Sequence, residues 1–176
     1  MRKRILNLGC GSDTYGTDFV DTYPLNPRIK KCTVGEERFP YSTGTFDEVY
    51  SRCLLEHLKN PYNALKEMVR VLKPGGKLMI ITDNAGWWAF HTPFSTVHYG
   101  GYEKNRAKKY DKHYSLFTAW HIRNHLVSLN LNNIEVRYVL VKEKTPQLLV
   151  RAISYIINFV GLSRIAYPNI VAEATK

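Results

Sequence analysis

A short apolar run that ends in a Gly-x-Gly turn restricts the fold of this chain more than any other feature. Ile5, Leu6 and Leu8 form a run that suits a buried parallel strand, and Gly9 and Gly11 follow it directly. Glycine lets the backbone turn sharply and approach a flat ligand where a Cβ atom would collide. A strand that leads into such a turn is typical of the nucleoside-binding edge of an α/β fold.

The length, composition and cysteine content indicate one globular domain. A chain of 176 residues is long enough to bury about 70% of its unfolded surface. Cys10, Cys32 and Cys53 have no metal-ligand spacing, which predicts reduced thiols in an intracellular protein and no metal site. The basic first four residues precede no long apolar stretch, so the sequence predicts no secretory signal and a cytoplasmic location.

Strands and helices are predicted to alternate along the chain. Strands are expected at 3–8, 19–21, 29–34, 46–51, 78–81, 134–140 and 170–174, and helices at 61–72, 119–129 and 148–160. Asn60 and Pro61 are typical of a helix start, and Pro74-Gly75-Gly76 is typical of a stop. Such alternation implies a parallel sheet that binds its ligands at the carboxyl ends of the strands.

The last predicted helix lies in an apolar segment, 147–162, with Arg151 as its single charge. Since a bilayer span needs about 20 residues, the sequence predicts no transmembrane segment. A buried helix, a partner-binding helix and a helix in contact with a membrane surface all fit this pattern.

The net charge is +10, and part of the excess is concentrated in one stretch. Five Lys or Arg residues lie at 104–112, opposed only by Glu103 and Asp111. Such a charge attracts anions, which include nucleic acid, phosphorylated lipid and nucleotide-linked substrates. A solvated loop is the alternative.

Four signals occur in order along the first half of the chain. The glycine turn is followed by Asp21 at a strand end, where a carboxylate can accept hydrogen bonds from both hydroxyls of a ribose. The segments 46–58 and 72–82 come next. Over about residues 4–84 the chain resembles class I S-adenosylmethionine-dependent methyltransferases of the type 11 group. The strings that carry the resemblance are Phe39-Pro40-Tyr41, Phe46-Asp47, Glu56-His57-Leu58 and Arg70 to Gly76.

The resemblance implies an α/β fold, namely a Rossmann-like methyltransferase sandwich. Its central sheet would be mostly parallel, with helices on both faces and an antiparallel strand near the C-terminus. A single methyltransferase domain would cover residues 1–176, with an inserted loop at 85–115 on the acceptor side.

The resemblance also implies S-adenosylmethionine as the cofactor and assigns residues to its parts. Gly9, Cys10 and Gly11 would surround the methionine and ribose, and Asp21 would hold the ribose hydroxyls. The other assigned positions are Glu36 near the adenine amino group, Ser51 and Arg52 near the methionine end, and His57 in the pocket wall, with a structural role as its alternative.

Three departures from the family pattern stand out. Asn7 and Gly35 occupy positions where the family commonly has an acid. Only ten positions separate Gly11 from Asp21, which is too few for a full helical crossover. We therefore expect a compact loop and an uncovered strip of sheet, and we expect the helix at 148–160 or a second subunit to cover apolar surface nearby.

The insertion at 85–115 lies where the methyl acceptor is expected to enter. Its aromatic residues at 87–90 predict either an apolar lid or a self-packed loop. His91 and His113 are candidate general bases, as is His98.

Three functions remain open at this point. The first is methyl transfer to an unidentified small or lipid- or sugar-linked acceptor, expected to be anionic. The second is methylation of RNA, and the third is a non-catalytic binding subunit that keeps the methyltransferase fold. Contact with a membrane surface and a homodimer are further interpretations of the charge and of the apolar segment.

Overall fold

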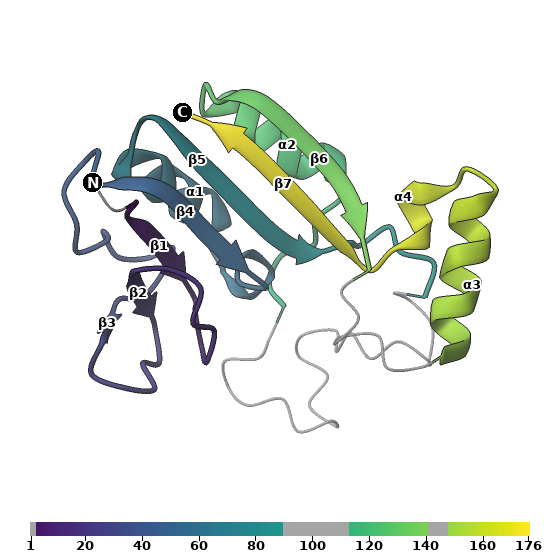
Figure 1. Ribbon diagram of the computed structural model, residues 1–176, viewed down its shortest axis with the longest axis horizontal. Coiled ribbons are helices and arrows are strands. Elements are labelled where there is room, and N and C mark those ends of the chain that lie inside the picture. The colour runs from purple at the N-terminus through teal and green to yellow at the C-terminus, as the bar shows by residue number, and fades with distance from the viewer. Residues whose placement is uncertain (1–2, 90–112, 141–147) are drawn as a thin grey trace.

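A computed structural model describes residues 3–89, 113–140 and 148–176, and in these ranges seven strands form one sheet (Figure 1). The strands are β1 (Ile5–Leu8), β2 (Asp18–Asp21), β3 (Ile29–Lys31), β4 (Phe46–Arg52), β5 (Leu72–Asp83), β6 (Asn132–Val139) and β7 (Asn169–Thr175). The helices are α1 (Pro61–Val71), α2 (Ala119–Ser128), α3 (Leu148–Phe159) and α4 (Ser163–Ala166), and a 3-10 turn, η1 (Leu55–His57), follows β4.

The order of the strands in the sheet is β3-β2-β1-β4-β5-β7-β6. The first five strands are parallel, and β7 runs antiparallel between β5 and β6. The predicted fold class, a mostly parallel sheet with an antiparallel strand near the C-terminus, is confirmed. The strand order reverses between β1 and β4, and ligands of such sheets bind at the carboxyl ends of the strands at this reversal.

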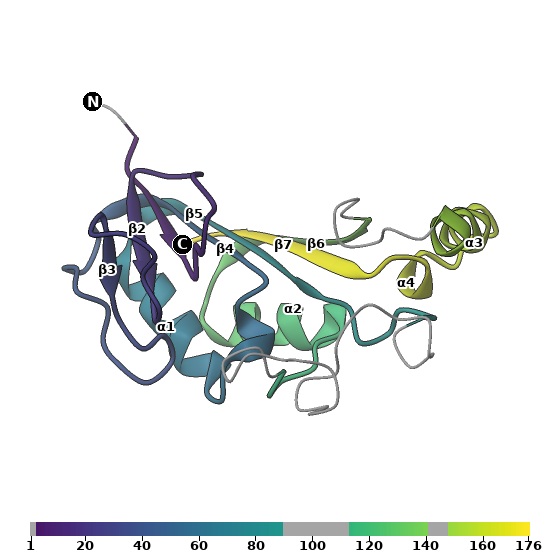
Figure 2. The ribbon, with the colours of Figure 1, turned by 90° about the horizontal axis from the view of Figure 1, so that it is seen from below.

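Helices α1 and α2 both lie on the same face of the sheet (Figure 2). There α1 buries Ala64, Leu65 and Met68, and α2 buries Ile122 and Leu126. In the ranges that the structure describes, the connections between β1, β2, β3 and β4 contain no helix. The expectation of helices on both faces is therefore met on one face only. The connections at 9–17 and 22–28 are too short for a full crossover helix.

Charged side chains occupy much of the opposite face. The carboxylate of Glu48 accepts a hydrogen bond from the Tyr15 hydroxyl at 2.7 Å. Glu173 forms ion pairs with Lys77 at 2.9 Å and with Arg137 at 2.6 Å. This polar lining lets a sheet face contact water, as one face of many antiparallel sheets does, and so reduces the need for a covering layer.

The side chain of Asn7 holds the compact loop that replaces the first crossover helix. Asn7 is 1% exposed, and its Nδ2 donates to the Tyr15 carbonyl oxygen at 2.9 Å. Gly16 has a φ of 126°, and a Cβ there would lie 3.2 Å from the carbonyl oxygen of Ile5. A carboxylate has no N–H to donate, so the loop explains why asparagine stands where the family commonly has an acid.

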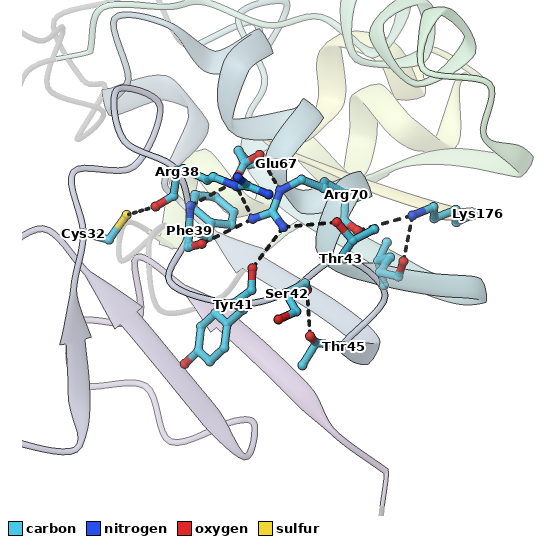
Figure 3. A network of polar contacts seen from close by, with 11 residues as sticks. Cys32, Arg38, Phe39, Tyr41, Ser42, Thr43, Thr45, Glu67, Arg70 and Lys176 are labelled. Atoms are coloured by element: carbon cyan, nitrogen blue, oxygen red, sulfur yellow. Dashed lines mark hydrogen bonds and ion pairs between the residues drawn. The ribbon is translucent and has the colours of Figure 1, made fainter.

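The main-chain carbonyls of the Phe39–Tyr41 string are tied to α1 by one guanidinium group (Figure 3). Arg70 donates to the carbonyl oxygens of Phe39 at 3.2 Å and Tyr41 at 2.9 Å. It also pairs with Glu67, which accepts from the Phe39 amide at 2.9 Å. The hydrogen bonds to Arg70 and to the Phe39 amide lower the pKa of Glu67, and those to Glu67 raise the pKa of Arg70. These two family strings therefore act here as structural anchors.

Helices α3 and α4 lie beyond the carboxyl end of β5 and stand clear of the sheet (Figures 1 and 2). The Ser154 hydroxyl on α3 accepts from the indole nitrogens of Trp87 at 3.4 Å and Trp88 at 3.1 Å. Trp87 and Val150 are buried in this small cluster. The helix was one of two candidates to cover apolar surface near the shortened crossover. In the structure its buried side contacts the two tryptophans instead, and coverage by a second subunit stays a prediction.

Candidate cofactor groove and acceptor site

The glycine turn lies at the carboxyl end of β1, at the reversal of the strand order. Gly9 has a φ of 63°, and a Cβ there would lie 2.7 Å from the Leu54 side chain. Gly11 has a φ of 50°, and a Cβ there would meet nothing within 4 Å. Gly9 is therefore required because Leu54 packs against it, whereas the absence of a side chain at Gly11 leaves open space beside the backbone.

Asp21 and the glycine turn are joined by a hydrogen bond. The amide of Gly11 donates to Asp21 Oδ2 at 2.9 Å, and the amide of Tyr23 donates to Oδ1 at 2.8 Å. These bonds fix the orientation of the carboxylate. Each oxygen has a second lone pair, so the fixed carboxylate can accept from two neighbouring hydroxyl groups, as a ribose presents.

A cavity of about 620 Å³ opens above this pair. Gly9, Gly11, Asp21, Glu36 and His57 all line it, so most of the predicted cofactor positions are brought together. The segment after β3 and the segment from η1 form its remaining walls. The volume lies within the range of about 300–1,000 Å³ typical of small-molecule sites.

A second cavity of about 490 Å³ lies next to the first and shares the glycine turn with it. Cys10 and Arg52 line this second cavity, whereas Ser51 is fully buried and lines neither. Burial raises the pKa of the Cys10 thiol to about 11, so this thiol is uncharged at neutral pH. The two cavities give a groove on both sides of Gly11, and its size, glycine cradle and carboxylate fit an adenosyl-containing cofactor.

Acidic and imidazole side chains from three parts of the chain gather beside the first cavity. The His113 Nδ1 lies 3.9 Å from Asp83 Oδ2, and both side chains are buried. The rings of His113 and His57 meet edge to face at 4.6 Å. The side chain of Glu56 accepts from the Thr82 hydroxyl at 2.8 Å. Asp83, at the carboxyl end of β5, thus lies beside the imidazole of His113.

Two of these acids, Glu56 and Asp83, belong to the group of residues that could hold a metal ion. Ligand atoms of Cys53, Glu56 and Asp83 lie within 4.8 Å of one another. Thr82 and Asn169 already donate to the two carboxylates, at 2.8 and 3.0 Å. Since both acids have protein donors, we assign no metal to this cluster.

Sequence reasoning found only part of this cluster of acidic and imidazole side chains. His113 was predicted as a candidate base, and the structure adds Asp83 as its partner. Asp83 ends a buried apolar run just as Asp21 does, and that signal could have identified it. His91 and His98 lie outside the described residues.

Comparisons with known proteins agree with this geometry. Residues 18–80 match the family described as a methyltransferase domain. A curated relative, methyltransferase str2 of Strobilurus tenacellus, is 28% identical in an alignment of 102 residues, and the match covers 48% of this chain and 36% of the relative. A demethylmenaquinone methyltransferase of Streptomyces griseus is 30% identical in an alignment of 113 residues. That match covers 54% of this chain and 48% of that protein. The chain thus spans between a third and a half of the length of these relatives.

Solved structures share the whole fold. A SAM-dependent methyltransferase of Thermotoga maritima, described as a possible histamine N-methyltransferase, superposes with a TM-score of 0.67 at 18% identity, covering 100% of this chain and 83% of its own. The phosphoethanolamine N-methyltransferase 2 of Haemonchus contortus, solved with S-adenosyl-L-methionine, has a TM-score of 0.59 at 17% identity, covering 99% of this chain and 48% of its own.

The strand order is that of the Rossmann-like methyltransferase fold, which the solved S-adenosylmethionine-dependent methyltransferases share. The sequence motifs predicted a type 11 methyltransferase over about residues 4–84, and the match to the methyltransferase domain family over residues 18–80 bears out that prediction.

Proposed function

We propose that this chain binds S-adenosylmethionine in the groove around Gly11 and directs methyl transfer to an acceptor that enters beside His113. The observation that carries the proposal is the Gly11–Asp21 hydrogen bond of 2.9 Å at the base of a cavity of about 620 Å³. Gly9, Cys10 and Gly11 would hold the methionine and ribose parts, and Asp21 the ribose hydroxyls. When bound, S-adenosylmethionine supplies an electrophilic methyl group on its sulfonium sulfur.

The protein's own contribution is alignment of the acceptor and removal of a proton. Holding the nucleophile in line with the methyl–sulfur bond supplies most of the acceleration in such a transfer. We assign the proton to the His113 imidazole, because Asp83 lies 3.9 Å from its Nδ1 and stabilises the charged ring. Glu36 and His57, in the wall of the cavity of about 620 Å³, would limit the space open to the adenine and to water.

The acceptor we favour is a small or lipid- or sugar-linked molecule that carries negative charge. The net charge of +10 supports an anionic acceptor. Two of the similar proteins have names that point to small acceptors, the demethylmenaquinone methyltransferase and the phosphoethanolamine N-methyltransferase.

RNA is the second candidate acceptor. The net positive charge of the chain favours RNA. A tRNA U34 carboxymethyltransferase of Trichlorobacter lovleyi is 27% identical in an alignment of 103 residues, and that match covers 46% of this chain and 32% of that protein. Filter binding at rising salt separates the two proposals, because RNA affinity falls steeply as counterions compete for phosphates. Absent or salt-insensitive RNA binding would remove this candidate.

Calorimetric titration with S-adenosylhomocysteine tests the proposal. We expect Asp21→Asn to weaken binding by about tenfold or more, because the ribose hydroxyls lose a charged acceptor. Asp18→Asn is the matched control, since Asp18 lies on the same strand but pairs with Arg4 at the opposite end. Equal affinity of the Asp21 variant and the unaltered chain would contradict the proposal, and so would no binding by either.

A further inference from the structure

Helix α3 turns its more apolar side toward solvent. Leu148 is 78% exposed, Ile156 is 64% exposed and Phe159 is 90% exposed. The exposed large apolar side chains of this stretch recur at helical spacing and form what we call the apolar face of α3: Leu148, Leu149, Tyr155, Ile156, Phe159 and Val160. Exposed apolar patches of this kind mark contact sites for proteins, ligands or membranes.

The orientation of this face is fixed by packing on the other side of the helix. Val150 and Ser154 are buried, and the Ser154 hydroxyl accepts from the indole nitrogens of Trp87 and Trp88. α3 also packs along α4. The helix cannot turn its apolar face inward without breaking these contacts.

The apolar surface continues past the end of α3. Leu162 and Ile165 are exposed, and together with Trp120 and Tyr138 they line a cavity of about 290 Å³. Trp120, at the start of α2, is itself 65% exposed. Aromatic side chains with a polar edge, such as Trp120 and Tyr155, are favoured where an apolar layer meets water.

The charge around this surface has one sign. Between residues 148 and 172, a stretch that contains α3 and α4, the sequence has no acidic residue, whereas Arg151 and Arg164 are basic. An apolar face with cations and no acids complements an anionic lipid surface. A second copy of the chain would bring the same positive charge to the patch, because the whole molecule carries +10.

We propose that α3 lies in the interface of a membrane that contains anionic lipid, with its apolar face in the acyl layer and Arg151 and Arg164 near the headgroups. None of the described helices is long and apolar enough to cross a membrane. The carboxyl end of β5, which carries Asp83, points toward α3 in Figure 1. Docking through α3 therefore brings the acceptor side of the molecule near the lipid surface.

Sedimentation with lipid vesicles tests this proposal without cofactor, so its outcome is independent of the proposed methyl transfer. We expect the unaltered protein to sediment with vesicles of equimolar phosphatidylcholine and phosphatidylglycerol, and less with phosphatidylcholine alone. Ile156→Glu combined with Phe159→Glu should reduce the vesicle-bound fraction by about tenfold or more, because two large apolar side chains lose their burial. Val127→Glu is the matched control, an exposed apolar position on α2, and should bind like the unaltered chain.

Circular dichroism of each variant checks that it is folded. The vesicle binding of the unaltered chain tests the proposal without any variant. Absence of binding to the mixed vesicles overturns it. A concentration-dependent dimer that the double substitution dissociates, with no vesicle binding, also overturns it and assigns the apolar face to a second copy.

Discussion

At the scale of single residues, the departures from the family pattern have physical reasons. Asn7 donates to the Tyr15 carbonyl and so holds a loop that is too short for the usual helix. Gly35 has a φ of 88°, and a Cβ there would lie 3.0 Å from the Asn60 carbonyl oxygen, so the position excludes the side chain of an acid. Neither reason is visible in the sequence, because each depends on a contact with another segment.

Asn7→Asp should destabilise the protein by about 1–3 kcal/mol, because a buried donor is replaced by a carboxylate with no N–H. The free energy of unfolding from urea denaturation measures the effect. Asn26→Asp is the matched control. The exposed Asn26 accepts a hydrogen bond from the Arg28 amide through its Oδ1, and a carboxylate oxygen at the same position can accept that bond. An Asn7 variant as stable as the control would show that the loop does not need this bond.

Glu67 should make part of the stability dependent on pH. Its pKa is lowered in the folded protein from an ordinary value of 4.5, first by the Arg70 hydrogen bond. The stabilisation is therefore complete above that value and is lost as the pH falls through the lower, folded pKa. Compared with the unaltered chain, Glu67→Gln should lower the free energy of unfolding at neutral pH, and the difference should shrink in acid. A difference that stays constant with pH would contradict this account.

At the scale of elements, the sequence pattern identified the strands and helices well, because their apolar spacing is local information. The ends were less accurate: β5 begins at Leu72, directly after α1, although the sequence pattern predicted a strand only at 78–81. The position of α3 was not predictable. An apolar pattern favours burial of the apolar side, whereas the structure exposes that side and buries Val150 and Ser154. The contact of this buried side with Trp87 and Trp88 depends on the whole fold.

At the scale of the whole molecule, a sheet with helices α1 and α2 on one face carries the candidate cofactor groove at the carboxyl ends of its strands. The predicted positions Gly9, Gly11 and Asp21 meet there because parallel strands share that edge, which the strand alternation implied. The proximity of Asp83 to His113 was not predicted, because His113 lies near the far end of the insertion and about thirty residues separate the two in the sequence. The account of function rests on whether the groove around Gly11 holds an adenosyl group.

A crystal structure of the protein grown with S-adenosylhomocysteine tests that claim most directly. The account predicts both ribose hydroxyls within hydrogen-bond distance of the Asp21 carboxylate, and the ribose seated over Gly11. A nucleoside bound elsewhere, or density in the groove that leaves Asp21 without contact to the ligand, would contradict it.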